Sequence, residues 1–207
     1  MSMIELIFDL ETKKFFDEID GERDPGVLGV SVVSVYRREL DENLNEKYGE
    51  MKSFFEAGFE EMWPWFEEAE RIVGYNSLGF DVPALVPYYP KGNMIHKLPH
   101  FDVLAKIREV FGRRVKLDSV AKETIGEGKI ADGGDAVRWW SMGDEKSLAN
   151  LKKYCEKDVE VTKGVYDFGL RNGRLKFKDH SNELREIVVD FSHPKVERKE
   201  EAQMGLF

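Results

Sequence analysis

The chain contains 207 residues, of which 42% are apolar, a composition typical of one soluble α/β domain with its own core. The single cysteine, Cys155, excludes an intrachain disulfide and a zinc site built from several cysteines. No apolar run is long enough to cross a bilayer and no basic-then-apolar leader precedes the first predicted strand, so we expect a cytoplasmic protein with no membrane partner. The net charge of −9 disfavours a polyanionic partner unless metal ions and a local basic patch offset it.

Alternating or valine-rich apolar segments predict four strands, at residues 4–10, 28–36, 48–55 and 71–74. Apolar residues at helical spacing predict helices over residues 59–69, 80–89, 101–111, 117–125 and 148–168. Residues 21–26 and the glycine-rich residues 126–134 are predicted loops. Three early strands followed by alternating helices and strands predict a mixed sheet surrounded by helices.

Two carboxylates lie two residues apart on the first predicted strand. Asp9 and Glu11 therefore project from one face, while Phe8 and Leu10 point to the opposite face and hold the strand in the core. Paired carboxylates at the end of a buried strand are costly unless a cation neutralises them, and hard oxygen ligands favour Mg²⁺ or Mn²⁺. The alternative is a solvated acidic pair at a strand end.

Two later segments carry further acidic residues. In GYNSLGFD, residues 74–81, a glycine loop follows a strand and Asp81 begins a helix, so Asp81 is either a site carboxylate or a helix cap. In YCEKD, residues 154–158, Tyr154 and Asp158 share one helical face. Asp158 lies among apolar neighbours, so it needs either a metal ion or a partner such as Lys153 or Lys157.

Together and in this order, FDLET at residues 8–12, GYNSLGFD and YCEKD resemble the three exonuclease motifs of DEDDy-type 3′–5′ exonucleases, in the DnaQ-like branch of the ribonuclease-H-like superfamily. The resemblance spans roughly residues 4 to 173, and its finer features are similar to a branch often fused to helicases. It implies an α/β fold with a mixed five-stranded sheet flanked by helices. It also implies a two-metal enzyme that removes nucleotides from the 3′ end of a strand.

The resemblance assigns a role to each motif residue. The metal-site carboxylates for two Mg²⁺ or Mn²⁺ ions would be Asp9, Glu11, Asp81 and Asp158. One ion would activate a water and the other would stabilise the leaving 3′-oxygen, with Asp9 bridging the two. Tyr154 would orient the water rather than take its proton, because its ordinary pKa is near 10. The candidate contacts to the terminal nucleotide are Leu10, Thr12, Asn76 and Phe80.

Residues outside the motifs have two interpretations each. Asp102 either caps the helix that follows it, which we favour, or supports the site from a neighbouring strand. Trp139 and Trp140 either stack on bases or bury one ring in the core. Two basic groups are candidate phosphate tracks or solvated surface, the first being Arg108, Arg113, Arg114 and Lys116, and the second Lys152, Lys153 and Lys157.

We expect an exonuclease domain over residues 1–180, a peripheral segment with a possible strand over 181–194, and a flexible charged linker over 195–207. The linker ends in QMGLF, which resembles the pentapeptide that binds the bacterial sliding clamp, with Gln203, Leu206 and Phe207 as partner-binding residues. The tail favours DNA, as single strands or 3′ ends, in replication or repair. The alternatives are an RNA-trimming exoribonuclease, a non-catalytic module that recognises strand ends, and a polymerase-associated proofreading subunit.

Overall fold

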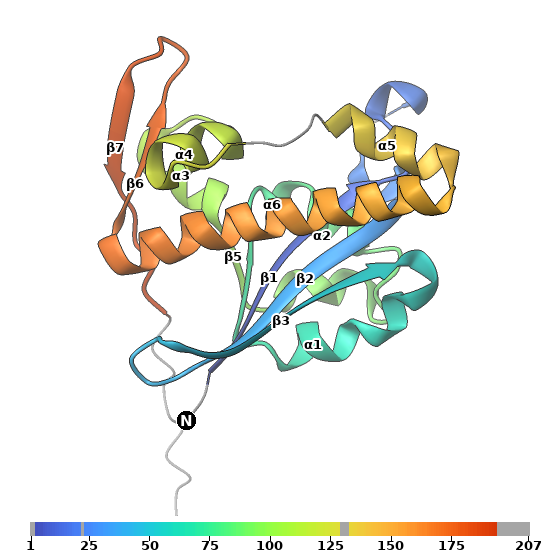
Figure 1. The fold of residues 1–207 in the computed structure, drawn as a ribbon, viewed down its shortest axis with the longest axis horizontal. Coiled ribbons are helices and arrows are strands. Elements are labelled where there is room, and N and C mark those ends of the chain that lie inside the picture. The colour runs from blue at the N-terminus through green and yellow to red at the C-terminus, as the bar shows by residue number, and fades with distance from the viewer. Residues whose placement is uncertain (1–2, 22, 129–132, 194–207) are drawn as a thin grey trace, which may run out of the picture.

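A mixed five-stranded sheet forms the centre of the protein (Figure 1). The computed structural model describes residues 3–21, 23–128 and 133–193. The strand order is β3-β2-β1-β4-β5, in which β1 pairs antiparallel with β2 and parallel with β4. The strands are β1 (Met3–Thr12), β2 (Val30–Leu40), β3 (Glu46–Phe55), β4 (Arg71–Gly74) and β5 (His100–Asp102). The predicted mixed sheet is confirmed.

Helices flank the sheet, and the longest, α6 (Glu145–Asn172), lies across one face of it (Figure 1). Asp144 caps α6 by accepting the backbone N–H of Ser147 at 3.0 Å, and Gly173 ends it in the left-handed region at φ 63°. The other α-helices are α1 (Trp63–Glu68), α2 (Asp81–Leu85), α3 (Val103–Phe111), α4 (Leu117–Ile125) and α5 (Gly133–Met142). Within the described residues, none of the helices combines the length and apolar character needed to cross a membrane.

The two faces of β1 have different surroundings, as its alternation predicts. Leu6, Phe8 and Leu10 are buried in a cluster that includes residues of α1 and α2. The opposite face meets α6, which runs in the reverse direction: Tyr166 bonds to Glu5 near the start of β1, and the Cys155 thiol lies 3.3 Å from the carbonyl oxygen of Asp9 further along. One face of one strand therefore brings Glu5, Asp9 and Glu11 to the same helix.

Several predicted elements have different bounds in the structure. The segment predicted as helix 101–111 begins with strand β5, and only Val103–Phe111 is helical. Of the helix predicted at 59–69, the first part is a 3-10 helix (Glu56–Glu61) and α1 follows it. The helix predicted at 80–89 shortens to α2, as the prolines in that segment suggest. The long helix predicted at 148–168 extends at both ends.

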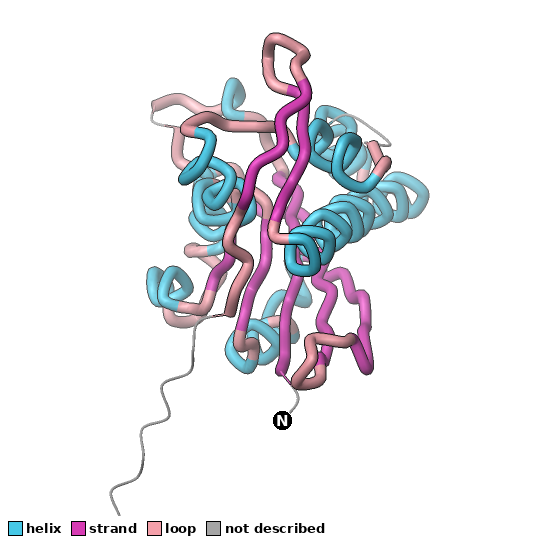
Figure 2. The backbone as a smooth tube through the Cα atoms, turned by 90° about the vertical axis from the view of Figure 1, so that its left-hand side faces the viewer, coloured by secondary structure: helices cyan, strands magenta, loops and turns pink. Residues whose placement is uncertain are grey.

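A second sheet follows α6. It is the hairpin of β6 (Arg174–Lys178) and β7 (Leu184–Val188), whose strands pair antiparallel across the predicted domain boundary at residue 180. Figure 2 is turned so that the side carrying this hairpin faces the viewer. Leu175 and Phe177 are buried in the core beneath α6, as are Val189 and Phe191 just after the hairpin. Most of residues 181–188 are exposed, whereas Val189 and Phe191 anchor the end of the segment in the core.

A buried ion pair joins the start of β1 to β2. Glu5 is fully buried and Arg38 is 3% exposed, with Arg38 Nη2 2.7 Å from Glu5 Oε2. The Tyr166 hydroxyl donates to the other carboxylate oxygen at 2.8 Å, and Arg38 Nη1 lies 2.7 Å from Asp167. Burial alone would raise the pKa of Glu5, but its hydrogen bonds and the Arg38 charge hold that pKa below its ordinary value.

The same network holds the last described residues. Arg71 donates to the carbonyl oxygens of Phe191 at 2.8 Å and Ser192 at 2.6 Å. His193 Nε2 lies 3.0 Å from Glu5 Oε1. The chain is thus fixed to the beginning of β1 and β4 as far as residue 193.

Candidate active site

Three carboxylates meet where β1 passes under α6. Asp9 and Glu11 come from β1 and Asp158 from α6, and one oxygen of each lies within 4.8 Å of the others. All three are half-buried, so their mutual repulsion is only partly screened by water. A compact group of hard oxygen donors fits a divalent ion such as Mg²⁺ or Mn²⁺. Among the described residues this is the group of acidic side chains arranged to hold a metal ion.

The fourth predicted carboxylate, Asp81, is not part of this 4.8 Å group. It is the first residue of α2 and is 5% exposed. Burial raises the pKa of its carboxyl to about 7, and the charge of Asp102 adds to the rise, although backbone N–H groups of Asp81 and Leu10 oppose it. The bond from Leu10 places Asp81 against β1 between the positions of Asp9 and Glu11.

Tyr154 lies one helical turn before Asp158 and is 6% exposed. Burial raises the pKa of its hydroxyl far above the ordinary value, and the charges of Asp158, Glu11 and Asp9 raise it further. The ring of Trp139 packs against it edge-on, with centroids 6.0 Å apart. The hydroxyl therefore stays protonated next to the three carboxylates and can act as a hydrogen-bond donor there.

Asp102 has both of the roles considered for it. It caps α3 by accepting the backbone N–H groups of Leu104 at 2.9 Å and Ala105 at 3.2 Å. It also accepts the N–H groups of Asn76 at 2.8 Å and Leu78 at 3.1 Å, in the loop between β4 and α2. This support holds Asn76 in the left-handed region at φ 64°, where an asparagine is tolerated better than most residues.

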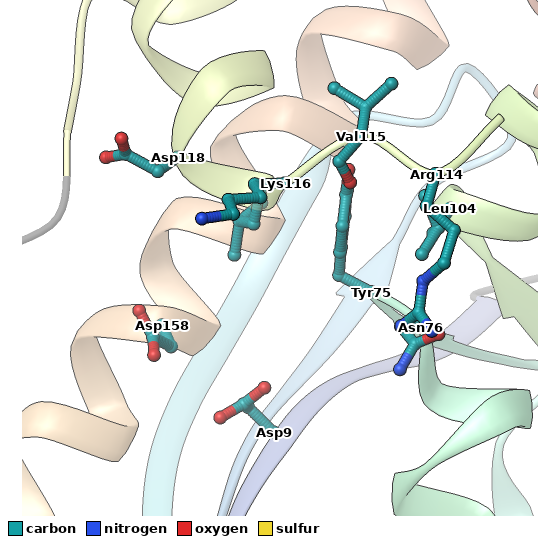
Figure 3. Close-up of a pocket in the computed structure, with 10 residues that line it drawn as sticks. Asp9, Tyr75, Asn76, Leu104, Arg114, Val115, Lys116, Asp118 and Asp158 are labelled. Carbon is teal, nitrogen blue, oxygen red and sulfur yellow. Dashed lines mark hydrogen bonds between the residues drawn. The ribbon is translucent and has the colours of Figure 1, made fainter. Parts of the chain in front are cut away.

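A cavity of about 700 Å³ opens beside the carboxylates. Asp9 and Asp158 lie on one side of it, and Asn76, Arg114 and Lys116 are among the residues that line the rest (Figure 3). Arg114 Nη2 donates to the side-chain oxygen of Asn76 at 3.0 Å. Carboxylates and basic side chains therefore line one space, a combination that suits a phosphate held by metal ions and by basic side chains.

The structure separates the predicted basic residues. Of the first group, Arg114 and Lys116 line the cavity, whereas Arg113 contacts His180 of the hairpin and Arg108 is exposed on α3. The second group, Lys152, Lys153 and Lys157, lies on α6 outside the cavity lining. There Lys157 pairs with Glu127 at 3.0 Å, and Lys152 lies 3.7 Å from Glu156.

The predicted nucleotide contacts are placed as follows. Leu10 is buried in the core, and Phe80 is half-buried with its ring edge-on to Phe16. The Thr12 hydroxyl donates to the carbonyl oxygen of Lys14 at 2.9 Å, which fixes the chain just after β1. Gln203, Leu206 and Phe207 lie outside the described residues.

Of the two interpretations of Trp139 and Trp140, base stacking or packing in the core, the structure favours packing for Trp139. Trp139 packs with the cluster that contains Tyr154 and Cys155, so it supports the site from behind. Trp140 is half-buried at the same cluster, and the Lys13 ammonium lies 5.3 Å from its ring centroid.

Sequence reasoning misses two residues of the cavity wall. Asp118, in the first turn of α4, lines the cavity as a further carboxylate. Tyr75 also lines it, and its hydroxyl donates to the carbonyl oxygen of Val115 at 2.7 Å, which ties the β4 loop to the segment before α4. The available signal for Asp118 is its position directly after the basic run, but a first-turn aspartate is common at any helix start.

Comparisons with known proteins agree with this architecture. Residues 6–168 match the model of the RNase_H superfamily, and no curated protein matches the chain. Among solved structures, the chain is similar to the family B DNA polymerase from the hyperthermophilic archaeon Pyrobaculum calidifontis, with 21% identity and a TM-score of 0.57. The similarity covers 81% of this chain and 24% of the polymerase chain, so the protein spans about a quarter of the polymerase's length.

At this identity the likeness to the polymerase shows a shared fold. The family match reaches further, because it extends over most of the chain and includes both β1, with Asp9 and Glu11, and the part of α6 that carries Asp158. The mixed sheet, its order and the long helix over β1 are consistent with that match. The chain belongs to the RNase H superfamily.

Proposed function

We propose that the protein is a metal-dependent 3′–5′ exonuclease of the DEDDy type that acts on DNA strands. The observation that carries the proposal is the group formed by Asp9, Glu11 and Asp158 beside a cavity that Arg114 and Lys116 also line. A phosphodiester bound in this cavity would meet both metal ions held by the carboxylates and the guanidinium and ammonium donors.

In this proposal the carboxylates of Asp9, Glu11 and Asp158 hold divalent ions, and Asp81, which accepts the backbone N–H of Leu10, completes the set. Such ions, when bound, would activate a water and stabilise the leaving oxygen. The buried Asp81 carboxyl, whose pKa is about 7, gains from a nearby cation because ionisation then becomes favourable. The donor set thus fits hard divalent ions, and we propose that these are Mg²⁺ or Mn²⁺.

Tyr154 is proposed to orient the attacking water. Its hydroxyl remains protonated and lies beside the carboxylates, so it donates a hydrogen bond and fixes the water's lone pairs without accepting the proton. Arg114 is held by Asn76, which is itself fixed by Asp102, so the cationic side of the cavity is preorganised. The terminal nucleotide would pack near Phe80 and the end of β1.

The preference for DNA and the proposed docking to a bacterial sliding clamp rest on the QMGLF tail of the sequence, at residues 203–207. In the proposal Leu206 and Phe207 fill an apolar pocket of the clamp, and Gln203 bonds at its rim. Titrating the full chain, and a variant ending at residue 202, against a bacterial clamp tests this part separately. Equal binding by both forms, or binding by neither, contradicts it.

The central experiment is digestion of 5′-labelled and 3′-labelled single-stranded DNA, duplex DNA and RNA of one sequence with Mg²⁺. We expect products shortened stepwise from the 3′ end, no products with EDTA, and loss of turnover in Asp9→Asn and Asp158→Asn. Glu42→Gln, which neutralises an exposed carboxylate between β2 and β3, is the matched control and should keep full activity.

Two readouts separate the parts of the proposal. Calorimetric titration with Mn²⁺ should show binding to the wild type and weakened binding to Asp9→Asn, independent of any substrate. Turnover that survives in both aspartate variants would refute the site. Shortening from the 5′ end would refute the polarity, and faster RNA cleavage would reassign the substrate to RNA.

A further inference from the structure

A second hollow adjoins the catalytic cavity. It has a volume of about 260 Å³ and shares Arg114, Val115 and Lys116 with the first, so the two spaces meet at this segment. Its other wall is formed by Ser119 near the beginning of α4, by Lys178 at the end of β6 and by His180 in the turn that follows. We refer to this second space as the hairpin groove.

The hairpin groove has an unusual charge for an acidic protein. Arg114 and Lys116, which line it, are both exposed. Lys178 adds a third cation; its pair with Glu123 is 3.6 Å long between part-exposed side chains and is therefore weak. With a net charge of −9 for the whole chain, this local excess of cations marks a surface suited to phosphates.

Acidic residues do not cancel this charge along the groove. Asp179 lines it, but its carboxylate lies 2.7 Å from Arg185 Nε and also accepts backbone N–H groups of the turn between β6 and β7. Asp118 lies on the side of the catalytic cavity rather than in the hairpin groove.

The wall formed by the hairpin is fixed in place. The Ser119 hydroxyl donates to the carbonyl oxygen of Lys178 at 2.9 Å and accepts its N–H at 3.2 Å. Thr124 forms the same reciprocal pair with Lys176, at 2.7 and 3.0 Å. Beneath them the ring of Phe177 packs edge-on to a ring of α3 with centroids 4.9 Å apart. Two side-chain hydroxyls thus bind β6 to α4, so the groove keeps its width without a ligand.

We propose that the hairpin groove holds the part of a single strand that lies upstream of the nucleotides in the catalytic cavity. Phosphates would pass from Arg114 and Lys116, which both spaces share, to Lys178 and His180 on the hairpin. This inference rests on the proposed nuclease function, because it uses the catalytic cavity as the position of the strand end. It makes the β6–β7 hairpin a substrate-binding element and gives the enzyme a preference for strands long enough to reach it.

The test compares short and long substrates. Fluorescently labelled oligothymidylates of three and twelve nucleotides are titrated with wild type, Lys178→Ala, the double variant Lys178→Ala/His180→Ala, and Lys97→Ala. Binding is measured by anisotropy in EDTA, and KM is measured with Mg²⁺. Lys97 is the matched control because it is an exposed lysine that lines neither space.

We expect both hairpin variants to weaken binding of the twelve-nucleotide strand several-fold and to leave the three-nucleotide strand and kcat unchanged. For the long strand, the association constant K falls with salt concentration. The negative slope of log K against log[salt] should become less steep by about 0.7 when the Lys178 contact is lost. Equal losses for both lengths, or none for either, overturn the inference. If the wild type binds the long strand but degrades nothing, the nuclease proposal fails. The binding comparison between the two strand lengths still tests whether the hairpin groove holds the strand.

Discussion

Replacing Asp102 tests whether one carboxylate supports both α3 and the loop at the cavity. Its Oδ1 accepts the N–H groups of Asn76, Leu104 and Ala105, and its Oδ2 accepts that of Leu78. Asp102→Ala removes a helix cap, at a cost of about 1 kcal/mol. It also leaves two part-buried loop N–H groups without a partner, at about 1–3 kcal/mol each. We expect a total loss of about 3–5 kcal/mol, since the loop can recover some bonds to water.

Asp102→Asn should behave differently because an amide keeps one oxygen. That oxygen can retain the three bonds made by Oδ1, whereas the amide nitrogen would face the N–H of Leu78, so the expected loss is about 1–2 kcal/mol. Urea unfolding followed by tryptophan fluorescence measures both losses, and strand digestion measures their effect on the site. Equal losses for the two variants, or a greater loss for asparagine, would refute the assignment of bonds to the two oxygens.

Three other substitutions test separate features. Tyr154→Phe should lower kcat about 100-fold with little change in strand affinity, because it removes a positioning donor, and unchanged kcat in single-turnover assays would contradict this. Glu5→Gln should lower the free energy of unfolding by about 3 kcal/mol at neutral pH. Since the folded pKa of Glu5 lies below its ordinary 4.5, this difference from wild type should persist above pH 4.5 and disappear as the pH falls through the lowered pKa, and a loss independent of pH would refute the ionic interpretation. Gly169→Ala would place a Cβ 2.2 Å from the ring of Phe191, so its melting temperature should fall by the equivalent of about 1–3 kcal/mol, while Gly58→Ala, with nothing within 4 Å, should melt like the wild type.

The acidic centre is largely predictable from the sequence because each of its pairs lies within one regular element. The period of a strand puts Asp9 and Glu11 on one face, and the period of a helix does the same for Tyr154 and Asp158. Their meeting depends on α6 crossing β1, which no local pattern encodes and which the family resemblance implies. The two roles of Asp102 are hidden for the same reason: its cap is local, but its bonds to residues 76 and 78 connect segments far apart in the chain.

The sequence of the β6–β7 hairpin does not reveal that it is a strand docked against a helix. Residues 174–178 alternate basic and apolar side chains, which is a strand pattern, and Leu175 and Phe177 are the buried positions. With three charges in five residues and only two apolar side chains, the segment is also typical of exposed chain after a helix. Its docking to α4 through Ser119 and Thr124 involves polar residues that carry no periodic signal.

The position of His193 determines how the protein could be tethered. Its contact with Glu5 fixes the chain at the start of β1, whereas Glu11 lies six residues further along that strand, about 20 Å away at the rise of an extended chain. Residue 193 therefore lies at the end of β1 that is remote from the carboxylates. A mechanical force applied at residue 193 would act first on the hydrogen bonds of Arg71 to residues 191 and 192 and on the contact of His193 with Glu5, before it reached the carboxylates.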